Sequence, residues 1–171
     1  MSKMTREEYL SLRHPFEPKN VTLAIIAESP PVSGLYFYNP RGRSTEPLFA
    51  ALMQQLGYSP GTKEDGLREF QRRGWLLVDA TYEPVNRHEV DRDSVISRDY
   101  PLLVNDIKSL ITNRLTPLIL VKANVCRILE PKLEADGFNV LNRGRVTYFP
   151  SNGQQTKFHQ QFGAILKSAA L

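Results

Sequence analysis

Cysteine, histidine and long apolar runs are scarce in this 171-residue sequence, and each scarcity excludes a class of site or protein. The single cysteine, Cys126, leaves no internal disulfide and no iron–sulfur cluster or zinc site built on several thiolates. The histidines show no spacing typical of metal ligands, so we predict no metal and no other cofactor. No run of about 18 apolar residues occurs, so we expect no membrane partner.

Residues 1–16 also lack the apolar segment and small-residue cleavage site of a secretory signal, so we expect a cytoplasmic protein. Hydrophobic residues make up 41% of the chain and charged residues 23%, which is typical of an ordinary globular protein. We therefore predict one domain over residues 1–171, present as a monomer. The net charge of +4 is a mild indication of a polyanionic partner.

Four short apolar runs rich in β-branched residues predict buried strands, and helical patterns separate them. The predicted strands cover residues 21–27, 75–78, 118–121 and 146–149. The predicted helices cover residues 46–56, 66–73, 99–115, 124–135 and 157–169, the last capped by Thr156, and residues 86–99 are predicted to form an exposed loop. This alternation predicts an α/β fold with a parallel sheet covered by helices on both faces.

In open parallel sheets, ligands bind at the carboxyl ends of the strands. This rule selects residues 28–38, 79–86, 122–124 and 150–155 as the segments that would form a site. Each of them contains polar or aromatic side chains that could act on a ligand.

Together, these segments resemble the motifs of the uracil-DNA glycosylase superfamily. Ala-Glu-Ser-Pro-Pro at 27–31 and Gly-Leu-Tyr-Phe at 34–37 are similar to the family's GEAPG, GINPG or GQDPY motif and its G-x-x-F. Residues 79–86 are similar in order and spacing to N-A-x-x-x-x-P-x-N. Lys-Ala-Asn at 122–124 resembles the turn after the third strand, and Phe-Pro-Ser at 149–151 resembles the family's H-P-S. The resemblance extends over residues 21–163 and rests on the order of the motifs.

The resemblance implies a three-layer α/β/α fold around a four-stranded parallel sheet, without an iron–sulfur cluster. It also implies a cleft that accepts a base flipped out of DNA or another nucleic acid. Such an enzyme hydrolyses the N-glycosidic bond of a damaged or modified base, as in DNA repair. The sugar develops positive charge in the transition state, so a carboxylate near the sugar and donors around the departing base would stabilise it.

Three residues are candidates for the catalytic role. Glu28 resembles the acidic residue of GEAPG, although it could instead be a strand-end glutamate bonded to loop amides. Ser29 could orient a water but could not stabilise a cation as a carboxylate does. Asp79 stands where the family often has asparagine, and an ionised aspartate only accepts hydrogen bonds, so we predict a pocket that disfavours uracil. Asp79 could alternatively be the working carboxylate or a loop anchor.

Two further candidates would form walls for a base. Pro30, with Pro31, would stiffen the loop after the first strand and hold a ring against a fixed surface. Phe37 matches the aromatic residue on which the family stacks the flipped base, an interaction worth about 1–3 kcal/mol. It could equally be a core aromatic between Tyr36 and Tyr38.

Phe149 stands where the family has the histidine that stabilises charge on the leaving base. Losing such a donor costs about 10²–10³ in rate, so we do not expect an efficient uracil glycosylase. Ser151 and Asn152 follow in the same loop and are predicted to contact the base. Asn152, Gln154 or Gln155 could supply a substitute donor.

Arg41, Arg43, Lys122 and Asn124 are the candidates for contacts with the nucleic-acid backbone. For the two arginines the alternative is a solvated loop, and for Lys122 it is a surface salt bridge. Three functions stay open at this point. The chain could be a DNA glycosylase, a catalytically inactive nucleic-acid or nucleotide-binding protein of the same fold, or a small-molecule hydrolase that uses Glu28 or Asp79.

Overall fold

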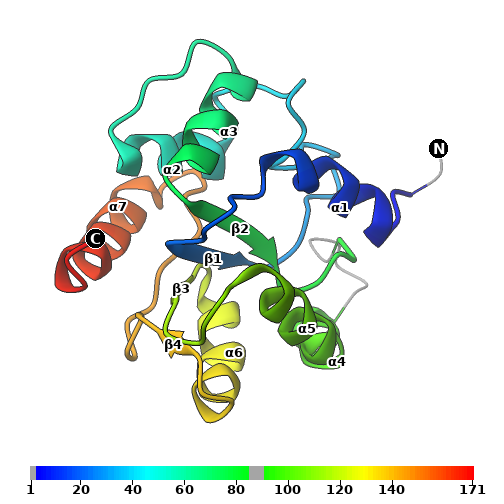
Figure 1. Cartoon of the computed structure of the whole chain (residues 1–171), viewed down its shortest axis with the longest axis vertical. Coiled ribbons are helices and arrows are strands. Elements are labelled where there is room, and N and C mark those ends of the chain that lie inside the picture. Colours follow the sequence, from blue (N-terminus) through cyan, green and yellow to red (C-terminus); the bar gives the residue numbers. More distant parts are fainter. Residues whose placement is uncertain (1–2, 85–90) are drawn as a thin grey trace.

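The computed structural model describes residues 3–84 and 91–171. Within these ranges Figure 1 shows helices arranged around a central sheet. In chain order the elements are α1 (Arg6–Arg13), the 3-10 helix η1 (His14–Phe16), β1 (Leu23–Ala27), α2 (Pro47–Leu56), α3 (Lys63–Arg72), β2 (Trp75–Asp79), α4 (Arg92–Arg98), α5 (Tyr100–Leu110), β3 (Pro117–Leu120), α6 (Ala123–Ala135), β4 (Asn139–Val140) and α7 (Gln155–Ser168).

The strands form one four-stranded parallel sheet with the order β2-β1-β3-β4. In the central strand, Leu23 pairs with Trp75 and Ala27 with Asp79, while Ile26 pairs with Leu120 of β3. The parallel pairing brings the carboxyl ends of β1, β2 and β3 to one edge of the sheet. The predicted α/β fold with a parallel sheet is therefore confirmed.

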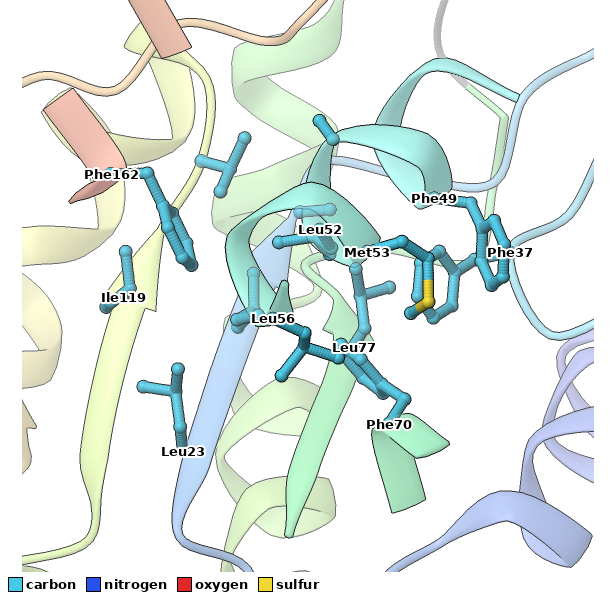
Figure 2. Close-up of a cluster of buried hydrophobic side chains, with 14 of the residues drawn as sticks. Leu23, Phe37, Phe49, Leu52, Met53, Leu56, Phe70, Leu77, Ile119 and Phe162 are labelled. Atoms are coloured by element: carbon cyan, nitrogen blue, oxygen red, sulfur yellow. The ribbon is translucent and has the colours of Figure 1, made fainter. Parts of the chain in front are cut away.

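Side chains alternate between the two faces of β1 and belong to two separate hydrophobic clusters. Leu23 and Ile25 join a cluster that includes residues of α2, α3 and α7, and Figure 2 shows part of it. Ala24 and Ile26 join a second cluster with residues of α5 and α6. Helices thus cover both faces of the sheet, an arrangement compatible with three layers.

The free edge of β2 is covered by tyrosine hydroxyls. The Leu77 N–H donates to the Tyr38 hydroxyl at 2.8 Å, and the Asp79 N–H lies 3.4 Å from the Tyr82 hydroxyl. An exposed strand edge otherwise offers unpaired groups to other chains. The two tyrosines therefore supply partners for two N–H groups of this edge and attach the loops that follow β1 and β2 to it.

The predicted strand at 146–149 is wrong, because the fourth strand is β4 at Asn139–Val140. Beyond β4, the Asn142 side chain takes the place of a strand next to β3. Its Oδ1 accepts from the Leu120 N–H at 2.8 Å, and its Nδ2 donates to the Leu120 carbonyl at 3.1 Å. Among described backbone bonds, residues 146–149 contact the end of β3 only where the Lys122 N–H donates to the Thr147 carbonyl at 2.7 Å.

The segment predicted as an exposed loop at 86–99 contains helix α4, whose first turn is capped by the Asp91 side chain accepting from the Ser94 N–H. Residues 86–90 of that prediction lie outside the described residues. The helix predicted at 99–115 ends at Leu110.

At the two ends of the chain, the helical predictions also need correction. Helix α1 is stabilised by a capping box between Thr5 and Glu8 and was not predicted. Helix α7 begins at Gln155, so Thr156 lies within it and does not cap it. None of the helices described is both long and apolar enough to cross a membrane.

Candidate functional site

A cavity of about 290 Å³ lies at the carboxyl ends of β1 and β2. This is the edge of the sheet at which the sequence predicts a site. The structure brings a large part of the predicted site to this one cavity. The predicted residues that line it are Glu28, Ser29, Pro30, Phe37, Asp79, Lys122 and Phe149.

Two acidic residues at the ends of adjacent strands, Glu28 and Asp79, line the cavity, and Asp79 also lines a second pocket together with Tyr82 and Asp106. Ala27 pairs with Asp79, so Glu28 follows one residue beyond the paired position. Both side chains are buried, with Glu28 7% exposed and Asp79 4% exposed. The charge on Glu28 is one of the influences that raise the pKa of Asp79. The two acids therefore share one cavity and act on each other electrostatically.

Glu28 is held by two donors from the turn after β3. Its Oε1 accepts from the Lys122 ammonium at 2.6 Å, and its Oε2 accepts from the Asn124 Nδ2 at 2.6 Å. Lys122 adopts a φ of 91°, a sparsely populated conformation that costs a non-glycine residue about 1–3 kcal/mol. The turn directs Lys122 and Asn124 at Glu28, so the structure places them as partners of this carboxylate.

The Asp79 carboxyl group has no hydrogen-bond partner among residues 3–84 and 91–171. Burial raises its pKa from the ordinary 3.8 to about 8; the charges of Asp106 and Glu28 add to this, and Arg13 opposes it. Asp79 is therefore mainly a neutral acid at pH 7, which donates as well as accepts. The prediction of a pocket that disfavours uracil assumed an ionised Asp79, a premise that holds only above about pH 8.

Behind Asp79 lies a buried polar network that the sequence did not reveal. Arg13 of α1 is 1% exposed and donates to both carboxylate oxygens of Asp106 in α5, at 2.8 and 2.7 Å. It also donates to the Tyr82 hydroxyl at 2.9 Å. Arg13 also pairs with Glu17 four residues later, at 2.8 Å, but its partners Asp106 and Tyr82 lie 93 and 69 residues away in the chain, so no local pattern marks its burial.

Aromatic side chains form the apolar wall of the cavity. Phe37 is mostly buried, with its ring centroid 5.7 Å from that of Phe49 and 5.3 Å from that of Phe70. Figure 2 shows Phe37 and Phe49 side by side at one end of this cluster. Phe37 therefore lines the cavity and belongs to the hydrophobic core at the same time. Phe149 and Pro30 complete the apolar lining.

A buried ion pair fixes the loop that carries this wall. The Lys63 ammonium of α3 donates to Glu46 at 2.6 Å and to the backbone carbonyl of Tyr36 at 2.8 Å. The other oxygen of Glu46 accepts from the Arg43 N–H at 2.7 Å. Glu46 and Tyr36 both line the cavity. Sequence reasoning missed these residues, because a lysine and a glutamate 17 positions apart carry no visible sign of burial.

Other predicted residues are not brought to the cavity. Ser151 and Asn152 are exposed, and the Ser151 N–H bonds back to the Phe149 carbonyl at 2.8 Å in a tight turn. Arg41 and Arg43 are exposed on the loop before α2 and do not line the cavity. Their predicted contacts with base or phosphate therefore stay predictions.

No described group of three or more His, Cys, Asp or Glu side chains is placed to hold a metal ion. The chain matches no protein-family model, and no curated protein shows significant sequence similarity to it. What it does is therefore inferred from its residues and the geometry of this cavity.

Proposed function

We propose that this chain hydrolyses the N-glycosidic bond of a base flipped out of nucleic acid, with a fold like that of the uracil-DNA glycosylase superfamily. One observation carries the proposal. A salt-bridged carboxylate, Glu28, and a neutral acid, Asp79, line the same apolar cavity. A carboxylate paired with a cation, beside a carboxyl group with a raised pKa, is an arrangement suited to base and acid roles in one site.

Glu28 is suited to the sugar side of the reaction. Cleavage of the bond leaves positive charge on the sugar, and a fixed carboxylate stabilises that charge or accepts a proton from the attacking water. The donors from Lys122 and Asn124 hold Glu28 in one orientation. Ser29 lines the cavity next to it and can orient the water.

Asp79 is suited to the base side. A leaving base gains negative charge, which a protonated carboxyl group stabilises by donating a hydrogen bond or its proton. Phe149, at the position of the family's histidine, lines the cavity but cannot donate. Asp79 supplies the donor that this replacement removes.

The size and lining of the cavity suit one planar ring. Its volume of about 290 Å³ is at the lower end of the range of pockets for small molecules. Phe37, Phe149 and Pro30 offer apolar surfaces to the faces and edges of a ring. The apolar walls lower the local polarity, which strengthens the interactions of a bound ring with both acids.

Incubation with oligonucleotides tests the proposal. Single-stranded and duplex substrates carrying uracil, hypoxanthine, xanthine or an alkylated base are treated with the protein and then with alkali, which cleaves the strand at abasic sites. We expect cleavage with at least one substrate. Glu28→Gln should lower the rate about 100-fold or more, and Asp79→Leu by a similar factor. The rate of Asp79→Asn should lie between those of the parent chain and Asp79→Leu, because the amide keeps a donor.

Glu64→Gln is the matched control, because Glu64 is an exposed glutamate on α3 that does not line the cavity. It should leave the rate unchanged. Full activity in both Glu28→Gln and Asp79→Leu, or the absence of abasic sites with every substrate, would contradict the proposal.

A nucleic-acid or nucleotide-binding protein without catalysis is the second candidate. It is favoured by the ion pair of Glu28 with Lys122, which offsets the negative charge that a developing cation needs. Binding without base release, with an affinity that falls steeply as salt rises, would support this candidate.

A further inference from the structure

Two polar groups without partners line the same cavity. The Tyr36 side chain is 1% exposed, and its hydroxyl group is buried without a hydrogen-bond partner in the part of the chain described. The Asp79 carboxyl group also lacks one there. Both residues line the cavity of about 290 Å³. Buried polar groups are nearly always paired in folded proteins, so the buried Tyr36 hydroxyl without a partner in the described ranges, beside a cavity that Asp79 also lines, points to a ligand.

Two neighbouring tyrosines have the hydrogen-bond partner that the Tyr36 hydroxyl lacks within the described structure. The Tyr38 hydroxyl accepts from the Leu77 N–H at 2.8 Å, and the Tyr82 hydroxyl accepts from Arg13 at 2.9 Å. Neither of these tyrosines lines the cavity. These two hydroxyls have partners in the protein, whereas the hydroxyl of Tyr36, which lines the cavity, has none among the described residues.

Both orphan groups can donate a hydrogen bond at neutral pH. Burial and the nearby charge of Asp79 keep the pKa of Tyr36 above its usual value, so the phenol keeps its proton. Asp79 is protonated below about pH 8. The groups that act on Asp79 are Arg13, Glu28 and Asp106, and Asp79 in turn acts on the three tyrosines Tyr9, Tyr36 and Tyr82.

We infer that the Tyr36 hydroxyl, together with the Asp79 carboxyl group, binds the exocyclic oxygen of a planar ring held in this cavity. The ligand class is an aromatic or heteroaromatic ring with a carbonyl oxygen, or the oxyanion that forms when such a ring departs. A tyrosine and a neutral carboxylic acid in an apolar pocket are a known combination for stabilising an oxyanion. The inference rests on the proposed function and names how the same cavity would hold the leaving base.

Two nonionising probes of nearly equal shape test the inference without any glycosidic bond. Acetophenone carries a carbonyl group on a planar ring, and α-methylstyrene has a methylene group in place of the oxygen. The measured quantity is the ratio of the dissociation constant of α-methylstyrene to that of acetophenone, obtained by titrations followed by NMR. Taking the ratio within each variant removes any general change in the shape of the cavity.

Tyr36→Phe should lower this ratio about tenfold, the effect of one lost hydrogen bond. Tyr38→Phe is the matched control, since it removes a buried hydroxyl outside the cavity, and it should leave the ratio unchanged. Urea unfolding curves confirm that both variants are folded, with the midpoint for Tyr36→Phe no lower than in the parent chain because the hydroxyl is unpaired.

The contribution of Asp79 is tested on the unmodified chain. Raising the pH from about 6 to about 9 removes its proton, so the ratio should fall several-fold. Asp79→Asn keeps a donor but does not titrate, so its ratio should not change with pH. A ratio unaffected by Tyr36→Phe, or no binding of either probe, would overturn the inference. If Tyr36→Phe lowers the ratio but the parent chain releases no base from oligonucleotides, the inference is supported and the proposed function is contradicted.

Discussion

At the scale of the residue, hydrogen-bond partners decide what each buried acid can do. Glu28 and Asp79 are both buried carboxyl groups, yet Glu28 has two donors within 2.6 Å and Asp79 has none among the described residues. A carboxylate with a cation and an amide donor is stabilised in its charged form, whereas an unpartnered one takes up a proton. The two acids thereby acquire complementary roles without any difference in chemistry between their side chains.

The raised pKa of Asp79 predicts how stability depends on pH. The folded state holds the proton up to about pH 8, whereas an unfolded aspartate releases it near pH 4. Between these values the folded state binds more protons than the unfolded state, so the free energy of unfolding decreases as the pH rises. Asp79 should contribute a slope of about 1.4 kcal/mol per pH unit in this window.

Asp79→Asn should remove that contribution. Urea unfolding at several values between about pH 5 and pH 8 measures the free energy of unfolding of the parent chain and the variant. The value for the variant minus that for the parent should increase as the pH rises, because only the parent loses stability. Parallel curves across this range would show that Asp79 titrates normally.

Sequence reasoning found the residues whose place in the chain reveals them. Glu28, Asp79 and Lys122 follow apolar runs, so their position at strand ends could be predicted. Lys63 and Arg13 were missed as site residues because their partners lie far away in the chain, and Tyr36 because its hydroxyl is buried without a partner in the described part of the chain. Burial of a charge and the absence of a partner are tertiary properties that no local pattern records.

At the scale of the element, side chains take over hydrogen bonding where the strands end. Tyr38 and Tyr82 cover the edge of β2, and Asn142 completes β3 beyond the two residues of β4. The sequence predicted the three longer strands from continuous apolar runs. It placed the fourth at 146–149 for the same reason, but Asn142 already occupies the position next to β3, a substitution invisible in a hydrophobicity pattern.

The pair of Arg13 with Asp106 joins α1 to α5 behind the site. Arg13→Met should lower the free energy of unfolding by about 3–5 kcal/mol, because it leaves Asp106 buried without a countercharge. Arg72→Met is the surface control; its partner Glu69 belongs to the same helix, and the change should cost less than about 1 kcal/mol. Both are measured by urea unfolding at one pH.

A second substitution checks the physical reason. Adding Asp106→Leu to Arg13→Met removes the uncompensated charge and should restore part of the lost stability. If Arg13→Met alone costs no more than Arg72→Met, the Arg13 network does not join the helices as described.

At the scale of the whole molecule, the parallel sheet is what assembles the cavity. Residues from the ends of β1, β2 and β3 meet at one edge, and α2 with the preceding loop closes the other side. Helix α1 and α5 supply the charges that surround Asp79 from behind. The state of Asp79 is therefore a property of the complete fold, since these elements lie far apart in the sequence.

The central claim is that a charged and a neutral carboxyl group share this cavity at neutral pH. An NMR titration of the side-chain carboxyl carbons tests it directly, with the Asp79 signal assigned by its loss in Asp79→Asn. The Asp79 signal should titrate with a midpoint of about 8. A midpoint near the ordinary value of about 4 would contradict the claim, and with it the acid role of Asp79 in the proposed reaction.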